Sequence, residues 1–240
     1  MILKYGEKSL TYRVRRARDD RSRVRIHVYP SGEIHVDAPS NADIHDVHVA
    51  VQKRARWIFK KHAGFTAQRR FAAPREYVSG ESHFYLGRRY KLVVINGTGE
   101  PSRVRLFRGR LEALMHDSSS PKEVRELLAV WYKERAREIL RQRFNDIAQR
   151  MTWVGVMPSL RFRQMKTQWG SCSVSGLINL NPALIRAPRH CIDYVITHEL
   201  CHLSEHNHSR RFYRRLKSQL PAWEKVKREL DDLAELILAN

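Results

Sequence analysis

The sequence predicts an α+β protein in which a strand-rich N-terminal region precedes a region of helices and one small sheet. Up to about residue 117, short apolar stretches alternate with polar residues and are separated by glycines, which is typical of strands. A helix start signal then appears at residues 120–123, and a helical apolar pattern near residue 198 carries several histidines. We therefore expect a β-rich N-terminal subdomain with one helix over residues 1–117 and a second subdomain over residues 118–240.

The N-terminal elements follow from the alternation of apolar and polar residues. Residues 24–36 predict a hairpin that turns at Pro30, Ser31 and Gly32. Residues 42–62 have the apolar spacing of one helix. Short strands are expected around residues 76–80, 83–87, 90–95 and 104–107.

The C-terminal elements begin at a strong helix start. Ser120 is expected to cap the helix, Pro121 suits its first position, and Glu123 completes a capping box. The helix should run to about Arg150. Three short strands at residues 160–165, 168–173 and 177–180, a helix opening at Pro188 and a final helix over residues 222–239 complete the prediction.

The chain is strongly basic. Its 45 Lys and Arg residues against 25 Asp and Glu residues give a net charge of +20. Such a charge attracts nucleotides, nucleic acid or anionic membrane surfaces. Arg13–Arg25 contains seven arginines, which indicate either a solvated hairpin or a phosphate-binding surface.

The expected location follows from segments that the sequence does not contain. The first thirty residues do not resemble a signal peptide, and no run of eighteen apolar residues predicts a transmembrane segment. The three cysteines are an odd number without a CxxC pair, which fits a reducing compartment and disfavours a cysteine-built zinc site. We therefore expect a cytoplasmic protein.

The segment HELCHLSEHNH, residues 198–208, predicts a metal site. On a helix, His198 and His202 project about 40° apart and can occupy adjacent corners of a tetrahedral zinc site. Glu199 lies on the flank, where its carboxylate reaches a metal-bound water. The preferred third ligand is His208, because Asn207 tolerates the left-handed backbone conformation that would fold the chain back; His206 is the alternative. Cys201 is expected to be a packing residue.

Four motifs together resemble a known family. They are KTQWGSCS (166–173), INLNPALI (178–185), DYVITHELCHL (193–203) and NHSRRFY (207–213), and PSGEIHVDAPSNA lies upstream of them. Their order and spacing resemble the YgjP-like metallopeptidase-domain family, which is related to the SprT and Wss zinc proteases. The resemblance covers roughly residues 20–230. It implies that His198, His202 and His208 are zinc ligands and that Glu199 is the general base. Tyr213 departs from the tryptophan that many relatives carry.

The resemblance also implies a zincin-like catalytic subdomain, with an HExxH active-site helix beside a small sheet. Trp169, Gly170 and Ser171 would then form the sheet edge that flanks the substrate cleft and accepts an extended peptide. The alternative is that Trp169 and Gly170 are an ordinary strand residue and a bulge. Ser171 and Cys172 are poor candidates for a nucleophile, since no GxSxG motif surrounds them.

Three functions are compatible with these observations. The preferred one is a metallopeptidase-like hydrolase with one zinc ion per chain, although imidazole ligands also suit nickel, cobalt or copper. The second is a nucleoside triphosphate pyrophosphohydrolase, since arginines can stabilise phosphate charge. The third is a nucleic-acid-binding module with a structural zinc. The expected partners are accordingly a peptide, an anionic nucleotide or nucleic acid.

Overall fold

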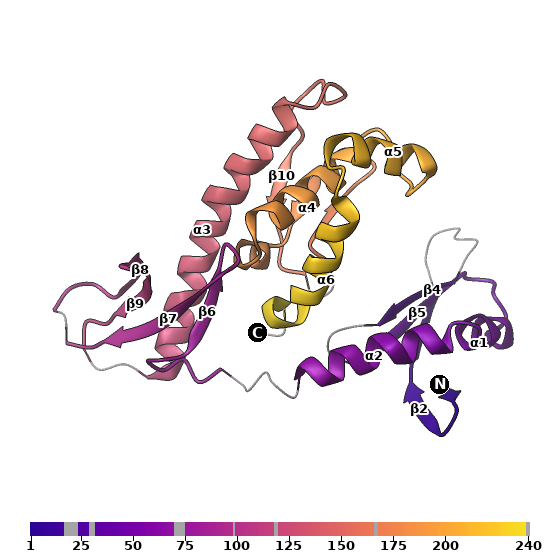
Figure 1. Ribbon diagram of the computed structural model, residues 1–240, viewed down its shortest axis with the longest axis horizontal. Helices are drawn as coiled ribbons and strands as arrows, with labels where there is room; N and C mark the ends of the chain where they lie inside the picture. Colours follow the sequence, from indigo (N-terminus) through magenta and orange to yellow (C-terminus); the bar gives the residue numbers. More distant parts are fainter. Residues whose placement is uncertain are drawn as a thin grey trace. The chain divides into compact units, whose positions relative to one another are not determined.

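The computed structural model describes residues 1–16, 24–28, 32–69, 75–97, 99–117, 120–165 and 168–238 (Figure 1). These residues form a mixed α+β structure of six α-helices and several small sheets, as predicted. The chain divides into two compact units, residues 1–73 and 74–238. Among the described helices, none is both long enough and apolar enough to cross a bilayer.

The first unit contains two sheets and two helices. β1 and β2 form an antiparallel hairpin, and β5 lies between β3, to which it is parallel, and β4, to which it is antiparallel. Their apolar side chains pack with the helices in one core, which includes Leu3, Val36, Val47 and Ile58. The elements are β1 (Ile2–Tyr5), β2 (Lys8–Thr11), β3 (Arg13–Arg16), β4 (Arg25–Val28), β5 (Ile34–Ala38), α1 (Ile44–Gln52) and α2 (Ala55–Arg69).

The first unit differs in part from the elements predicted for residues 24–62. The hairpin is present as the β4–β5 pair, whose turn residues Pro30 and Ser31 lie outside the described residues. The single helix predicted over residues 42–62 is divided into α1 and α2. The division occurs because the Arg54 amide bonds to Val51 O, an i to i−3 bond that tightens the last turn of α1. Of the arginine-rich segment 13–25, residues 17–23 lie outside the described part.

The second unit begins with a four-stranded sheet that packs on a long helix. The sheet has the order β6-β7-β9-β8, and Leu92 and Leu111 belong to the same core as Leu128 of α3. This shared core explains why the units divide at residues 73/74 rather than at 117. Residues 76–80 form no strand, and Tyr77 has a φ of 58°, outside the extended region. The elements are β6 (Ser82–Tyr85), β7 (Arg88–Ile95), β8 (Arg103–Phe107), β9 (Arg110–Leu114) and α3 (Pro121–Gln149).

The start of α3 confirms the predicted capping box. The Glu123 amide donates to Ser120 Oγ at 3.3 Å, and the Ser120 amide donates to Glu123 Oε2 at 2.7 Å. Pro121 occupies the first helical position, where its missing N–H leaves no bond unmade. The box anchors one end of the helix on which the rest of the unit packs.

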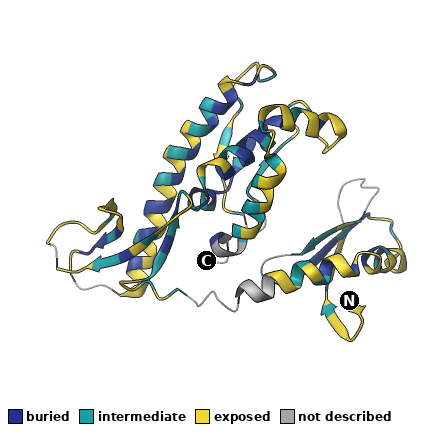
Figure 2. Cartoon of the chain, in the orientation of Figure 1, coloured by how far each residue is buried: buried dark blue, intermediate teal, exposed yellow. Residues whose placement is uncertain are grey.

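The remaining elements surround a small three-stranded sheet of order β10-β12-β11, in which β11 is an outer strand. β10 runs parallel to β12, and β11 runs antiparallel to it. Buried residues run along α3 and through α4 (Figure 2). The helix α5, which the sequence did not predict, buries Phe212 and Leu216 one turn apart. The elements are β10 (Leu160–Phe162), β11 (Gly170–Cys172), β12 (Ile178–Leu180), the 3-10 helix η1 (Pro182–Arg186), α4 (Arg189–Cys201), α5 (Arg210–Gln219) and α6 (Trp223–Leu238).

Candidate metal centre

The histidine motif lies at the C-terminal end of α4. Pro188 directly precedes the helix, and His202 is its C-cap. Cys191, Ile192, Ile196 and Leu200 are fully buried, so one face of α4 is fixed in the core. A bidentate pair joins α4 to α3, in which the Arg143 guanidinium donates to both Asp193 carboxylate oxygens at 2.9 and 2.8 Å. Contacts with the core and with α3 therefore fix the position of α4, the helix that carries His198.

His198, His202 and His208 lie together, and we call them the histidine cluster. One ring nitrogen from each lies within 4.8 Å of those of the other two. The Nε2 atoms of His198 and His208 are 3.0 Å apart. In a tetrahedral zinc site with Zn–N of ~2.0–2.1 Å, ligand nitrogens lie about 3.3 Å apart, so this spacing is near that of a metal site. His206, the alternative third ligand, is not in the cluster.

The chain returns from α4 to His208 by a different route from the one expected. Asn207 does not adopt a left-handed conformation. Instead, the amides of Ser204 and Glu205 both bond to Cys201 O at 3.2 and 3.0 Å, and the Ser209 amide bonds to Asn207 O at 2.7 Å. Cys201 is fully buried in the core, as its assignment to packing predicted.

Phe212 forms the floor of the histidine cluster. Its ring centroid lies 4.9, 4.6 and 4.7 Å from those of His198, His202 and His208, and the residue is fully buried. One aromatic ring therefore restricts the orientation of all three imidazoles. The sequence did not indicate this role of Phe212, because His208 precedes α5 and no regular spacing connects the two residues.

The surroundings of His198 and His202 favour neutral imidazoles, the form that binds a metal. Burial lowers the pKa of His198 to about 3, and burial also lowers the pKa of His202. His202 Nδ1 lies 3.1 Å from Glu205 O. Since a carbonyl only accepts, Nδ1 carries the proton and Nε2 is available as a ligand atom. Three imidazole ligands are a donor set that suits zinc.

Glu199 directly follows His198 on α4 and is buried from solvent. It is 6% exposed, and burial raises its pKa to about 8. Gly170 of β11 passes directly over this carboxylate. A Cβ atom at position 170 would lie only 2.7 Å from Glu199 Cγ and 2.8 Å from Oε1. The absence of a side chain at Gly170 is therefore what leaves room for Glu199.

The three residues predicted to line a substrate cleft have different surroundings. Gly170 contacts Glu199, as described. Half-buried Trp169 packs on the core, and its carbonyl accepts a 2.8 Å bond from the Asn181 amide. Ser171 Oγ lies 3.2 Å from Asn179 Nδ2, which donates to it from the neighbouring strand. Burial raises the pKa of the nearby Cys172 thiol to about 11, a poor value for a nucleophile.

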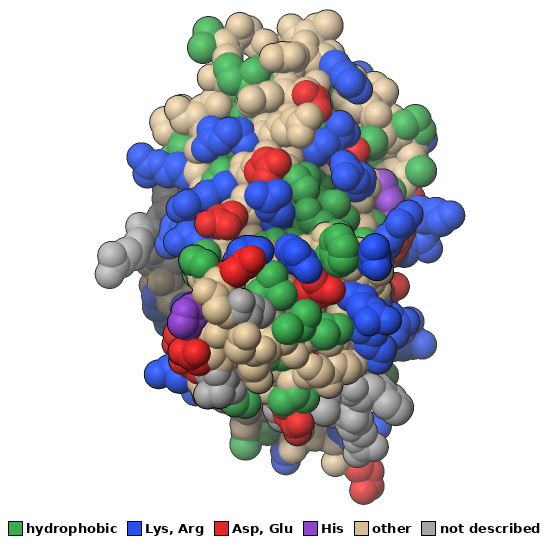
Figure 3. All heavy atoms as spheres, turned by 90° about the vertical axis from the view of Figure 1, so that its left-hand side faces the viewer, with side chains coloured by type: hydrophobic (Ala, Val, Ile, Leu, Met, Phe, Trp, Pro, Cys, Tyr) green, Lys and Arg blue, Asp and Glu red, His purple; other side chains and the backbone are tan. Residues whose placement is uncertain are grey.

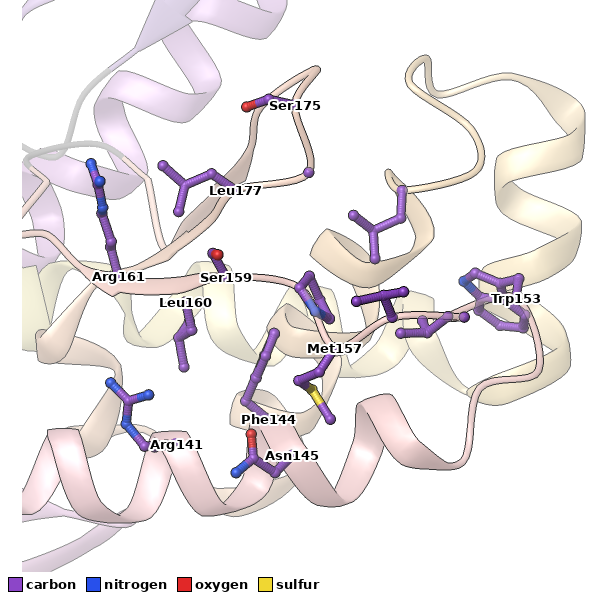
Figure 4. A pocket seen from close by; sticks show the side chains of 16 residues that line it. Arg141, Phe144, Asn145, Trp153, Met157, Ser159, Leu160, Arg161, Ser175 and Leu177 are labelled. Carbon is purple, nitrogen blue, oxygen red and sulfur yellow. The ribbon is translucent and has the colours of Figure 1, made fainter.

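A pocket of about 980 Å³ lies next to the end of α4 (Figure 4). Its apolar lining includes Phe144, Met157, Leu177 and Leu203. Figure 4 shows the side chains arranged between α3 and the turn that carries Ser175, with Trp153 at one end. The Trp153 indole donates to Leu200 O at 3.3 Å, which ties this wall to the helix that bears the histidines.

A second group of possible ligand atoms joins α4 to α6. His190, Cys191 and Glu229 also have ligand atoms within 4.8 Å of one another. Here His190 Nε2 and Glu229 Oε2 form a 2.9 Å pair, while burial raises the pKa of the Cys191 thiol to about 12. The His190–Glu229 pair links the two helices, and the Cys191 thiol is buried and protonated. Packing therefore explains why these three residues lie together.

Basic side chains are spread over the surface rather than gathered in one area of the face in Figure 3, where acidic and apolar side chains lie between them. Next to the histidine cluster the charge is more concentrated. α5 starts two residues after His208 and carries five cations without an acidic residue: Arg210, Arg211, Arg214, Arg215 and Lys217. The Arg215 guanidinium lies 4.5 Å from the centroid of Trp153, over its ring.

Comparison with known proteins gives a family match and similar solved structures. A family model described as "YgjP-like, metallopeptidase domain" matches residues 22–233. Among solved structures, the chain is similar to the metallopeptidase zymogen of Pyrococcus abyssi abylysin, at 24% identity and a TM-score of 0.33, over 41% of this chain and 94% of that one. No curated protein sequence matches the chain.

Proposed function

This chain belongs to the YgjP-like metallopeptidase-domain family, and from that membership and its site geometry we propose that it is a zinc-dependent peptidase. His198, His202 and His208 would hold the ion, and Glu199 would be the general base. The observation that carries the proposal is the convergence of three imidazole rings, with the buried carboxyl group of Glu199 next to His198 on the same helix. The metallopeptidase family implies a metal ion, and this donor set fits zinc.

Each residue of the site has a separate task. Zinc bound to the three imidazoles would polarise a substrate carbonyl and lower the pKa of bound water from ~15.7 toward ~7. Glu199 takes a proton from the attacking water and returns it to the leaving amine. Phe212 and the Glu205 carbonyl hold the imidazoles in position. Gly170 allows the β11 backbone to approach the carboxylate closely.

The position of β11 at the edge of its sheet favours binding of an extended peptide substrate. Its one described strand neighbour is β12, so the opposite edge can accept main-chain hydrogen bonds from a peptide. A peptide on this edge would pass Glu199 at Gly170. The apolar side chains of Leu177 and Leu203 in the larger pocket would contact an apolar substrate side chain.

The variant Glu199→Gln tests the proposed mechanism. The amide cannot accept a proton, so peptide turnover should fall about 10²–10⁴-fold while zinc content stays the same. Glu224→Gln, which alters an exposed carboxylate on α6, is the matched control and should keep full turnover. Zinc content is measured by mass spectrometry and turnover by release of free amine. Full turnover in zinc-loaded Glu199→Gln would show that another group is the base.

A second candidate function is hydrolysis of a nucleoside triphosphate. The observation that favours it is the row of five cations on α5, directly after His208. Arginines there would stabilise charge that develops on a transferred phosphate. Incubating the zinc-loaded protein with peptides and with nucleoside triphosphates separates the two functions. Release of pyrophosphate without release of free amine would contradict the peptidase proposal and support this second function.

A further inference from the structure

A second pocket, of about 530 Å³, lies between α3, the end of β10 and η1. We call it the α3–η1 pocket. None of its lining residues belongs to the histidine cluster or is Glu199. Three of the lining residues are cations, Lys133, Arg137 and Arg186, and no acidic residue lines it. Its chemistry is therefore distinct from that of the metal centre.

Arg186 is the most unusual residue of this pocket. Its guanidinium carbon lies 4.2 Å from the ring centroid of Tyr132, over the ring. Its Nε is buried and has no hydrogen-bond partner in the described residues. Burial lowers the pKa of Arg186, and the neighbouring Arg75 lowers it further. Tyr132 partly offsets this effect, but no acidic residue lines the pocket, so the charge of this half-buried guanidinium is not balanced there.

The two other cations add to the excess of positive charge in the α3–η1 pocket. Lys133 and Arg137 are four residues apart on α3, so they lie on the same face of the helix, where like charges repel. Both are exposed, and within the described ranges neither forms an ion pair with a carboxylate. Half-buried Phe162 closes the pocket between them and the small sheet. Three cations that have no carboxylate partner among the described residues thus surround a space large enough for a small molecule.

We propose that the α3–η1 pocket binds a small phosphate-bearing polyanion, with Arg186 as its main ligand and Lys133 and Arg137 at the rim. A guanidinium offers charged N–H donors in a planar arrangement that matches the oxygens of a phosphate group. Three cations favour a ligand with two or more negative charges over a monoanion. The site does not require a metal ion, so it can be tested independently of the proposed peptidase function.

Titration calorimetry with inorganic pyrophosphate tests this site. Metal-free protein at low ionic strength is used, because pyrophosphate also binds zinc. The wild-type protein should bind pyrophosphate more tightly than phosphate, should not bind acetate measurably, and should bind less tightly as salt is added. Arg186→Gln should weaken pyrophosphate binding about ten- to hundredfold, because it removes charge-assisted hydrogen bonds.

Two further variants keep the test decisive. The double variant Lys133→Gln/Arg137→Gln changes exposed residues only, and should weaken binding even if Arg186→Gln does not fold. Arg150→Gln removes an exposed arginine at the C-cap of α3, outside the pocket, and should bind as wild type does. The proposal is overturned if wild-type protein does not bind pyrophosphate, if acetate binds equally well, or if the pocket variants bind like Arg150→Gln.

Discussion

Replacing Gly170 with alanine would place a methyl group where the Glu199 side chain lies. The new Cβ would be 2.7 Å from Glu199 Cγ and 3.0 Å from Cδ, whereas ordinary contacts begin at 3.4 Å. Either the carboxylate or β11 must therefore shift by at least about 0.7 Å. Overpacking of this kind costs about 1–3 kcal/mol of unfolding free energy. A catalytic group misplaced by ~1 Å can lose about 10²-fold in rate.

We expect Gly170→Ala to bind zinc normally, to unfold at lower urea concentration and to hydrolyse peptides about 10²-fold more slowly. The matched control is Gly64→Ala in α2, where the added Cβ meets no atom within 4 Å. That variant should keep its activity, and its unfolding free energy should rise by about 0.5–1 kcal/mol because alanine favours the helix.

A double-mutant cycle identifies the cause of the effect. Glu199→Ala removes the Cγ and carboxylate atoms that the new methyl group would meet. In that background Gly170→Ala should lose most of its stability cost, giving a coupling free energy of about 1 kcal/mol or more. An equal loss of unfolding free energy in the wild-type and Glu199→Ala backgrounds would refute this reasoning. The loss would then come from β11 itself and not from contact with Glu199.

Three further predictions concern packing and charge. Phe212→Ala should lower the unfolding free energy by about 3–5 kcal/mol and weaken zinc binding in a competition assay, since this fully buried ring contacts all three imidazoles. Burial lowers the pKa of His83 from 6.5 to about 3, so the unfolded chain binds a proton between these values that the folded chain does not. Lowering the pH through this range should therefore cost up to about 5 kcal/mol of unfolding free energy at His83. In urea unfolding, His83→Gln should remove this share and leave the similar share of His198. Arg143→Gln should cost about 1–2 kcal/mol through loss of the pair with half-buried Asp193, as measured by chemical unfolding.

Each of these has an outcome that would contradict it. Unchanged zinc affinity in Phe212→Ala would mean that the imidazoles are held in place by other contacts. A wild-type acid dependence in His83→Gln would assign that dependence to other groups. An equal loss from Arg143→Gln in wild type and in Asp193→Asn would show that the two side chains do not act as a pair.

Features that depend on local spacing could be predicted from the sequence. The capping box at Ser120 and Glu123 requires only residues three apart, and it is present. His198 and His202 are four apart, so any helix brings them to one face, and α4 does so. The short return to His208 was predicted as well, although the backbone conformation proposed for Asn207 was wrong. Family membership followed from motif order, and the family match confirms it.

Other features depend on contacts between residues that are distant in the chain, and the tertiary structure alone decides them. The packing of the β6–β9 sheet with α3 places the division between units at 73/74. The sequence indicated Gly170 and Glu199 separately, but only the packing of β11 against α4 brings them into contact. Arg186 is one arginine among many in the sequence, and it becomes distinctive because the fold buries its Nε without a partner. Periodicity reports which face a residue occupies, whereas the identity of the group opposite depends on how the elements pack together.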